Sequence, residues 1–325
     1  YSNDTREDDT TRRLMACTVQ WQNIAKVTDA DAAEMIRRDG IDMLIDLSGH
    51  SSENRLGLFA LKPAPVQLSW LGYPHSTGME QIDYYISDKF CDPPGMTEHL
   101  FVEKLLRLPR IFSCYLPPLQ FPTVDSSPSK ISGVITFGSF NNFAKVNDKV
   151  IATWSEILNR VENSRLLLKS MALGDPSTQQ QVWAGFARYG VPKERIALLS
   201  TVNSALEHLA LYGQIDIALD TFPYHGTTTT CEALWMGVPV VSLAGKTHAS
   251  RVGVSLLNNV GLPELITSRQ NDYVCKAVSL AESRTKLQQY RETIRTKMAY
   301  SPLMDAAGFT RELEDVLCVI VRSYT

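Results

Sequence analysis

A regular alternation of short apolar runs with amphipathic runs fills most of this 325-residue chain, and it is the feature that most constrains the fold. Several apolar runs are rich in β-branched residues and apolar on both faces, as strands of a parallel sheet covered by helices must be. The alternation therefore predicts an α/β fold built of doubly wound units. The predicted strands are 41–47, 65–72, 83–88, 134–140, 164–169, 195–200, 215–221 and 238–245. The predicted helices are 29–38, 148–161, 177–189, 204–212, 228–236 and 250–260.

A segment rich in proline and serine, residues 116–130, interrupts this alternation and is typical of a linker. We predict an N-terminal Rossmann-like lobe of residues 1–120, a linker of residues 121–130 and a C-terminal lobe of residues 131–325 that ends in helices. The last of these helices is expected over residues 305–322. The N-terminal lobe has few strands, and its polar opening segment lacks the strand and Gly-containing turn with which a doubly wound domain begins. We therefore expect its first β-α unit to be missing.

The composition excludes several classes of function. The formal net charge is -3 and the pI is about 6.1, so the chain has no overall basic field that would hold nucleic acid or an anionic membrane. It contains no apolar run of 18 residues and no signal peptide, so we predict no membrane span. The six cysteines are scattered, without a CxxC pair, which favours a cytoplasmic protein whose thiols are small core residues.

The stretch DTFPYHGTTTTCEALWMG, residues 220–237, predicts a buried strand, a turn and a helix. The free N–H groups and the dipole of the first helical turn attract an anion, and Gly226 lets that anion approach the backbone. Thr227, Thr228 and Thr229 add hydroxyl donors at the same place. Ordinary N-capping is the alternative interpretation, but one threonine suffices for that. Four threonines in a row after a glycine favour a phosphate-binding turn.

Two charged residues extend this hypothesis. Glu232 follows in the first turns of the predicted helix and is a candidate acceptor for ribose hydroxyls, or else a solvated helix carboxylate. Lys145 lies just after the predicted strand 134–140 and is a candidate to neutralise a diphosphate leaving group, or else a surface lysine. The chain has neither a P-loop nor a GxGxxG motif. Two polar turns at strand ends in one lobe predict a nucleotide across the carboxyl edge of the sheet.

The remaining polar motifs are less specific. The loop 70–78 lines a cleft or forms a plain turn, and His50 is either an acid–base group or a hydrogen-bonded capping residue. His208 and His248 lie in or before helix patterns and lack the spacing of metal ligands. Asp29-Ala30-Asp31 resembles a metal-binding DxD motif, but its position predicts a helix N-cap. We predict no metal site.

Several of these segments together resemble a known family. The chain is similar to the O-linked GlcNAc transferases and the related SPINDLY protein O-fucosyltransferases of glycosyltransferase family 41. Similarity is closest to the SPINDLY-like branch, where FNNxAK and DTFPYxGTTTTCE appear in this form. The segments that carry it are IDMLIDLSGH (41–50), LKPAPVQLSWLGYPHSTG (61–78), DYYISD (83–88), FGSFNNFAKV (137–146), the long run LDTFPYHG…VGVSLL (219–257) and SPLMD (301–305).

The resemblance implies a GT-B fold, in which two Rossmann-like lobes face a cleft. It implies an inverting, metal-independent enzyme without a cofactor that moves GlcNAc from UDP-GlcNAc, or fucose from GDP-fucose, to Ser or Thr hydroxyls of proteins. In this family TPR repeats that bind protein acceptors precede the catalytic region. The histidine proposed for acid–base work lies in the opening unit that we expect to be missing. The location would be cytoplasmic, or nucleocytoplasmic in a eukaryote.

The resemblance also assigns roles by position. Lys145 would match the lysine that stabilises the departing nucleoside diphosphate. Thr227, Thr228 and Thr229 would match the phosphate-binding turn, and Glu232 the ribose-binding carboxylate.

Asn142 would match an amide that contacts the donor, and His208 a histidine of the nucleotide pocket. Ala205 stands where the animal GlcNAc enzyme has a lysine that contacts the base, so uracil recognition of that type is not implied.

Two alternatives differ from protein glycosylation. One is a GT-B enzyme that acts on a small molecule or a glycan. The other is a truncated module that binds a nucleotide without turnover.

Overall fold

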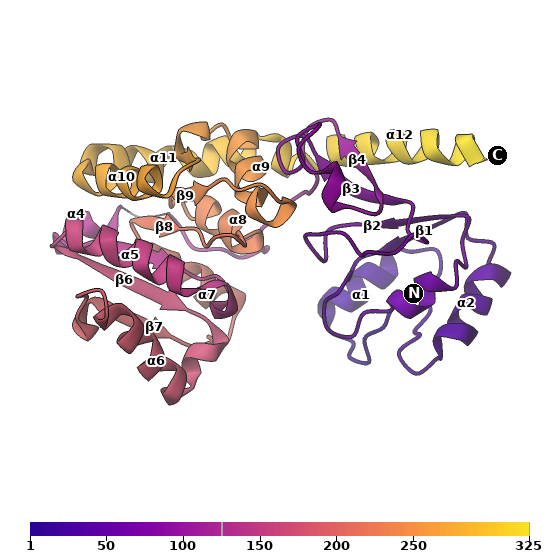
Figure 1. Cartoon of the computed structure of the whole chain (residues 1–325), viewed down its shortest axis with the longest axis horizontal. Coiled ribbons are helices and arrows are strands. Elements are labelled where there is room, and N and C mark those ends of the chain that lie inside the picture. The colour runs from indigo at the N-terminus through magenta and orange to yellow at the C-terminus, as the bar shows by residue number, and fades with distance from the viewer. Residues whose placement is uncertain (125, 325) are drawn as a thin grey trace. The chain divides into compact units, whose positions relative to one another are not determined.

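The computed structural model describes residues 1–124 and 126–324, which fall into two compact units (Figure 1). The first unit comprises residues 1–87, 98–107 and those from 313 on, and the second comprises residues 88–97 and 108–312.

The structure thus divides the chain at other residues than the predicted linker. Residues 108–124 pack within the second unit, where the Tyr115 N–H donates to the Leu303 carbonyl (2.9 Å) and the Phe121 ring meets the Trp235 ring edge-on. Within the predicted linker 121–130, residue 125 lies outside the described residues, and a short helix begins at Pro128.

The second unit contains a six-stranded sheet in the order β10-β9-β8-β5-β6-β7, with the strand pairs in parallel register. Counted from β7, this is the 3-2-1-4-5-6 order of a Rossmann fold, and the direction of winding reverses between β5 and β8. Ligands of such sheets bind outside the carboxyl ends of the strands at this switch point. The strands are β5 (Ile135–Ser139), β6 (Ser164–Lys169), β7 (Ile196–Leu199), β8 (Ile217–Leu219), β9 (Val240–Leu243) and β10 (Ile266–Thr267).

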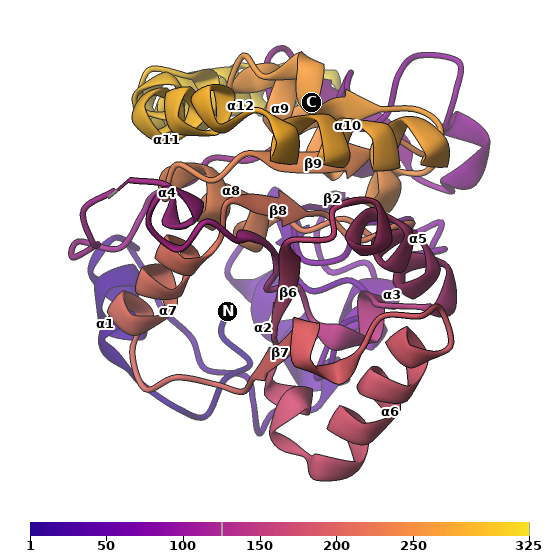
Figure 2. The same ribbon diagram turned by 90° about the vertical axis from the view of Figure 1, so that its left-hand side faces the viewer.

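Helices cover both faces of this sheet, as its buried strands require. Figure 2 shows α5 and α6 on one side of β6 and β7, and α7 on the other. The helices of this unit are α4 (Pro128–Ser132), α5 (Asp148–Arg160), α6 (Pro176–Ala187), α7 (Ala205–Leu211), α8 (Thr228–Trp235), α9 (Val252–Asn259), α10 (Gln270–Glu282) and α11 (Arg284–Ala299).

The packing between helices and sheet holds the end of β8 in place. In α5, apolar residues at helical spacing are buried, with Trp154 fully so. The Trp154 indole N–H donates to the Tyr273 hydroxyl of α10 (3.2 Å), which donates to the Asp220 carbonyl (2.9 Å). Asp220 directly follows β8, so two helices fix the point where this strand leaves the sheet.

The first unit is built on a four-stranded sheet in the order β1-β2-β3-β4, in which β1, β2 and β3 are parallel. Its strands are β1 (Met43–Asp46), β2 (Val66–Ser69), β3 (Tyr84–Asp88) and β4 (Lys104–Leu108), and its helices are α1 (Asp9–Ala16), α2 (Asp29–Arg38) and α3 (Leu56–Ala60). Asp88 and Leu108, at the ends of β3 and β4, are counted with the second unit. Small and branched residues of α2, including Ala32, Ala33 and Ile36, form its core with Leu58 and Phe59 of α3.

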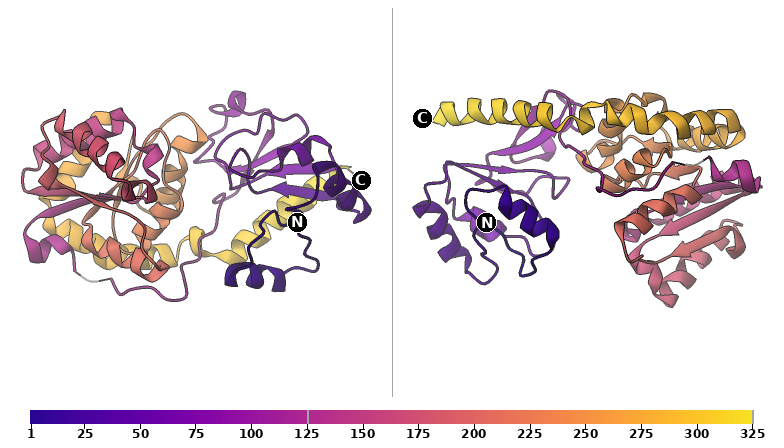
Figure 3. Two further views of the ribbon diagram at one scale, coloured as in Figure 1. Left: turned by 90° about the horizontal axis from the view of Figure 1, so that it is seen from below. Right: turned by 180° about the vertical axis from the view of Figure 1, so that it is seen from behind.

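The last helix, α12 (Ala306–Tyr324), is one continuous element (Figure 3). Its residues up to 312 belong to the second unit and those from 313 on to the first. Single turns of 3-10 helix connect the elements: η1 (Glu98–Leu100), η2 (Phe143–Lys145), η3 (Met171–Gly174), η4 (Lys193–Arg195), η5 (Tyr212–Gln214), η6 (His248–Ser250), η7 (Pro263–Leu265) and η8 (Pro302–Met304).

The α/β class and the eight predicted strands are confirmed, while five short elements were missed. The helices α3 and α4 have five residues each, too few for a helical period to show, β10 has two residues, and β4 contains no β-branched residue. The fifth, α1, buries no residue.

Two smaller predictions were wrong. The N-cap of α2 is Thr28, whose hydroxyl accepts the Asp31 N–H (3.2 Å), whereas Asp29 forms an ion pair with Arg55 (2.7 Å). The cysteines are not uniformly core residues, because only Cys91 and Cys231 are buried.

None of the helices in the described part of the chain is both long and apolar enough to cross a membrane.

Strand β6, which pairs with β5 and β7, offers a test of this packing. Leu166 is fully buried, so Leu166→Ala should lower the free energy of unfolding by about 2–5 kcal/mol through lost burial and a residual cavity. Urea unfolding measures this change. Leu116→Ala is the matched control, because the Leu116 side chain is 74% exposed. Equal losses for the two variants would contradict the placement of β6 in the core.

Candidate functional site

Two polar turns meet at the switch point of the second unit. One follows β5 and the other follows β8, and because these strands are parallel neighbours their carboxyl ends lie together. Side chains connect the two turns directly. The Thr229 hydroxyl donates to Asn141 Oδ1 (2.6 Å), and the Lys145 ammonium donates to the His225 carbonyl (2.8 Å).

The turn after β8 leads into α8 with its first N–H groups unpaired within the helix. The first main-chain bond of the helix runs from the Cys231 N–H to the Thr227 carbonyl (3.1 Å), so the N–H groups of Thr228, Thr229 and Thr230 precede it. The N-cap residue Thr227 makes no side-chain cap hydrogen bond. Ordinary capping therefore does not account for the run of threonines.

The four threonines have different surroundings. Thr230 is buried and its hydroxyl donates to the Gly226 carbonyl (3.1 Å), while the Thr229 hydroxyl is held by Asn141. Thr227 is half-buried and Thr228 is exposed. Two hydroxyls thus build the turn, and those of Thr227 and Thr228 have no hydrogen-bond partner among the described residues.

Gly226 is required by close packing at this turn. A Cβ there would lie 2.5 Å from the Thr229 hydroxyl oxygen, 2.6 Å from Asn141 Oδ1 and 2.9 Å from the Thr230 hydroxyl oxygen. All three distances are shorter than van der Waals contact.

A buried polar network lies beneath the turn. Asp220 is 2% exposed and its carboxylate accepts the Gly226 N–H (2.8 Å) and the Ser242 hydroxyl (2.8 Å). His225 is fully buried: its Nδ1 accepts the Gly253 N–H (3.0 Å), so its Nε2–H donates to the Leu243 carbonyl (2.9 Å). This network fixes both the N–H of Gly226 and the carbonyl that holds Lys145.

Lys145 stands at the end of η2, half-buried, with its ammonium 3.8 Å from the centre of the Tyr224 ring. Burial lowers the pKa of Lys145, and the negative charge of Asp220 opposes this shift. Lys145 is thus a partly desolvated cation, held by a carbonyl and a ring rather than by a carboxylate.

Asn142 is the predicted residue that the structure does not bring into this group. It is exposed, and its side chain accepts the Ala144 N–H (3.1 Å) within its own turn. The buried neighbour Asn141 makes the contacts with Thr229 and Asp220 instead.

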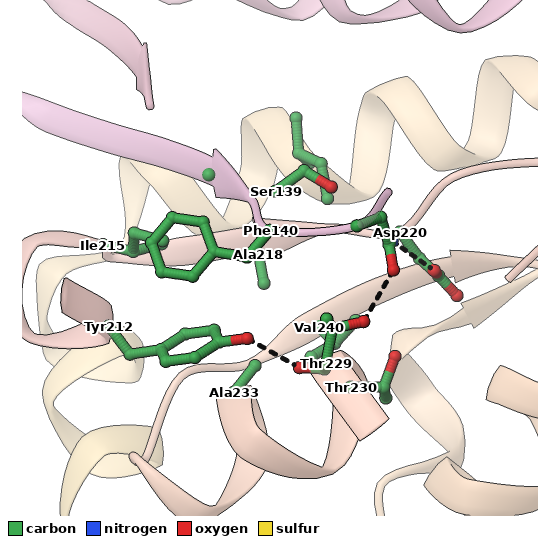
Figure 4. Close-up of a pocket in the computed structure, with 13 residues that line it drawn as sticks. Ser139, Phe140, Tyr212, Ile215, Ala218, Asp220, Thr229, Thr230, Ala233 and Val240 are labelled. Atoms are coloured by element: carbon green, nitrogen blue, oxygen red, sulfur yellow. Dashed lines mark hydrogen bonds between the residues drawn. The ribbon is translucent and has the colours of Figure 1, made fainter. Parts of the chain in front are cut away.

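Glu232 of α8 and His208 of α7 form a second cluster beside the threonine turn. His208 Nε2 lies 2.9 Å from Glu232 Oε2, and the two side chains are 18% and 16% exposed. The Tyr212 hydroxyl lies 3.1 Å from both Glu232 Oε2 and the Thr229 carbonyl. Figure 4 shows this hydroxyl directed at Thr229 beside the pocket that Asp220 also lines. The cluster is therefore joined to the threonine turn.

Sequence reasoning missed Asn141, Asp220, His225 and Tyr212. Asp220 and Asn141 could have been predicted, because each lies just after the end of a predicted strand. The burial of His225 could not be predicted from the sequence pattern.

The other histidines lie elsewhere. His50 belongs to the first unit, where its Nε2 is 2.8 Å from the Thr77 carbonyl of the 70–78 loop. His248 is buried in the second unit against Asp92, at 2.6 Å. Within the described ranges no group of three or more His, Cys, Asp or Glu side chains is placed to hold a metal ion.

Comparison with solved structures shows that the fold is that of the GT-B glycosyltransferases. The chain superposes on the Thermobaculum terrenum O-GlcNAc transferase mutant K341M with a TM-score of 0.93 and 40% identity, covering 100% of this chain and 61% of that one. A more distant likeness, TM-score 0.58 at 12% identity, is to Anabaena HepE, over 96% of this chain and 90% of that one. At that identity it shows the fold alone.

The family follows from the sequence comparison. The model of glycosyl transferase family 41 matches residues 2–115 and 128–313, so the chain belongs to this family.

Its curated relatives include two plant proteins. A probable UDP-N-acetylglucosamine–peptide N-acetylglucosaminyltransferase SPINDLY of Oryza sativa is 44% identical over 94% of this chain and 33% of its own length. The protein SEC of Arabidopsis thaliana, given the same probable activity, is 32% identical over 93% of this chain and 31% of its own. The chain thus spans about a third of the length of these relatives.

The packing of Gly226 yields a prediction. Gly226→Ala should lower the free energy of unfolding by about 1–3 kcal/mol through overpacking, as measured by urea unfolding. A Cβ at Gly213 would meet nothing within 4 Å, so Gly213→Ala is the matched control. If Gly226→Ala is as stable as the control, the turn is looser than described.

Proposed function

We propose that this chain is the catalytic part of an inverting, metal-independent glycosyltransferase that moves GlcNAc or fucose from a nucleotide-sugar to Ser or Thr hydroxyls of proteins. Membership of family 41 and the activities for which the plant relatives are named support the reaction class. The observation that carries the proposal is the convergence of Lys145 and the open first turn of α8 at the switch point of the sheet.

This convergence supplies the positive charge that a diphosphate needs. The unpaired N–H groups of α8 and the hydroxyls of Thr227 and Thr228 donate hydrogen bonds to phosphate oxygens, and the helix dipole favours negative charge there. Lys145 adds a full charge next to the same turn. We propose that these groups take the role that a metal ion has in other nucleotide-sugar enzymes.

We propose that the nucleoside binds at the neighbouring cluster of Glu232, His208 and Tyr212. Glu232 Oε2 is engaged by His208 and Tyr212, whereas Oε1 has no hydrogen-bond partner among the described residues. This oxygen is the proposed acceptor for a ribose hydroxyl, which agrees with a diphosphate seated one helical turn earlier on α8. We also propose that Asn142 contacts the sugar donor, because its side chain is exposed in the same turn as Lys145.

The proposed glycosyl transfer depends on stabilising the negative charge that develops on the leaving diphosphate. The bond between the anomeric carbon and the diphosphate oxygen breaks, and its electron pair leaves with the nucleoside diphosphate. The acceptor oxygen bonds to the opposite face of that carbon and loses its proton to a base. Lys145 and the N-terminus of α8 stabilise the charge that grows on the leaving group, so they act most strongly in the transition state.

The remaining parts of the proposal concern the whole protein. We expect TPR repeats to precede this region and bind protein acceptors, and we expect a cytoplasmic location. The similarity to SPINDLY proteins does not separate UDP-GlcNAc from GDP-fucose, so both donors are candidates.

The experiment that tests the proposal replaces Lys145. In the protein that carries this chain, Lys145→Met should lower kcat about 10²–10³-fold, the range for removing one transition-state donor, with a smaller effect on donor affinity. Turnover is measured with UDP-GlcNAc and with GDP-fucose on a protein acceptor.

Lys297→Met is the control, because Lys297 is exposed on α11. A kcat for Lys145→Met within about threefold of the unsubstituted protein contradicts the assigned role. Nucleotide binding without any turnover favours the binding module, and turnover only with a glycan or small-molecule acceptor favours that alternative.

A further inference from the structure

Lys169, the last residue of β6, lies outside every motif discussed so far. Its ammonium is 2.9 Å from His208 Nδ1, and His208 Nε2 is 2.9 Å from Glu232 Oε2. The three side chains come from β6, α7 and α8 and are all at least half-buried. They form a chain of hydrogen bonds that ends at the Tyr212 hydroxyl and the Thr229 carbonyl.

The chemistry of these groups fixes where the protons lie. A lysine ammonium can only donate, so Nδ1 of His208 must be the acceptor. A neutral imidazole that accepts at Nδ1 carries its proton on Nε2, and this proton points at the Glu232 carboxylate. Lys169 thereby selects the one neutral tautomer that can donate to Glu232. The Glu232 carboxylate, which can only accept, requires the same tautomer, so loss of the ammonium would release the ring at Nδ1 rather than change the tautomer.

The direction of the pKa shift agrees with this arrangement. Burial lowers the pKa of Lys169, and the negative charge of Glu232 opposes the shift. The carboxylate and the ammonium thus lie on opposite sides of one imidazole, and the carboxylate favours the charged form of Lys169.

We propose that Lys169 is a positioning residue for the donor nucleoside: it holds His208 as the Nε2–H tautomer, which holds Glu232 Oε2 and leaves Oε1 directed to a ribose hydroxyl. This inference rests on the proposed function, in which Glu232 accepts from ribose. It assigns Lys169 no contact with the phosphates, because its ammonium is engaged at the nucleoside end of the cluster.

The test compares ligands with and without a nucleoside. Calorimetry on this chain measures the affinity for UDP, for GDP and for inorganic pyrophosphate. Lys169→Met should weaken the better-binding nucleoside diphosphate at least tenfold and change pyrophosphate affinity less than twofold. Lys169→Arg, which also only donates, should retain most of the affinity. Lys193→Met, at a lysine that packs on Trp183, is the control for loss of a lysine.

A second measurement does not depend on any ligand. Nitrogen-15 NMR of the His208 ring, assigned with His208→Gln, should show the Nε2–H tautomer in both chains, because the Glu232 carboxylate accepts from Nε2–H, and a shifted Nδ1 signal in Lys169→Met, where Nδ1 has lost its ammonium partner. Structural damage alone would not produce this selective change in a folded variant.

The outcomes separate two failures. If the unsubstituted chain binds neither nucleoside diphosphate, the proposed function fails. If it binds one and Lys169→Met binds it equally well, loses affinity for pyrophosphate to the same extent, or leaves the His208 Nδ1 signal unchanged, the role of Lys169 is overturned.

Discussion

The pairing of β5 with β8 is the constraint on which the site depends. These strands are neighbours in space but are separated in sequence by two β-α units, because the sheet winds outward from β5 and then returns to its other side. Their carboxyl ends bring Asn141 and Lys145 against the residues between Asp220 and Thr229. No local segment could assemble this group of donors, because half of it comes from each side of the switch point.

Around this pairing the polar groups divide into two layers. Asp220 and His225 are buried and satisfied, and they hold the backbone of the turn rather than facing a ligand. Thr228, in contrast, is exposed to solvent. Lys145 is intermediate between the two groups, because it is half-buried and partly desolvated. A buried carboxylate beneath a cation and a helix N-terminus balances the positive charge at rest without occupying the place of an incoming anion. The donors are therefore set in position before any anion binds, which is the condition for the electrostatic catalysis that we propose.

Sequence patterns predicted the parts of this account that depend on local periodicity. Both strands and the threonine turn at the start of α8 followed from runs of adjacent residues, and the family resemblance was confirmed. Patterns could not tell that Asn141 rather than Asn142 would cross-link the turns, because two adjacent asparagines differ only in burial. The pairing of Lys169 with His208 was equally invisible, because it depends on how α7 lies against the end of β6. Likewise, the composition of residues 121–130 indicated a linker but not which unit the preceding residues pack against.

The central claim is that the first turn of α8 binds the diphosphate of the donor. The most direct measurement is the perturbation of backbone amide NMR signals when this chain is titrated with UDP or GDP. The account predicts that the amides of Thr228, Thr229 and Thr230 shift most, in the downfield direction expected for new hydrogen bonds to phosphate, and that inorganic pyrophosphate shifts the same three. Saturable binding with these amides unmoved, and the largest shifts on another helix, would contradict it.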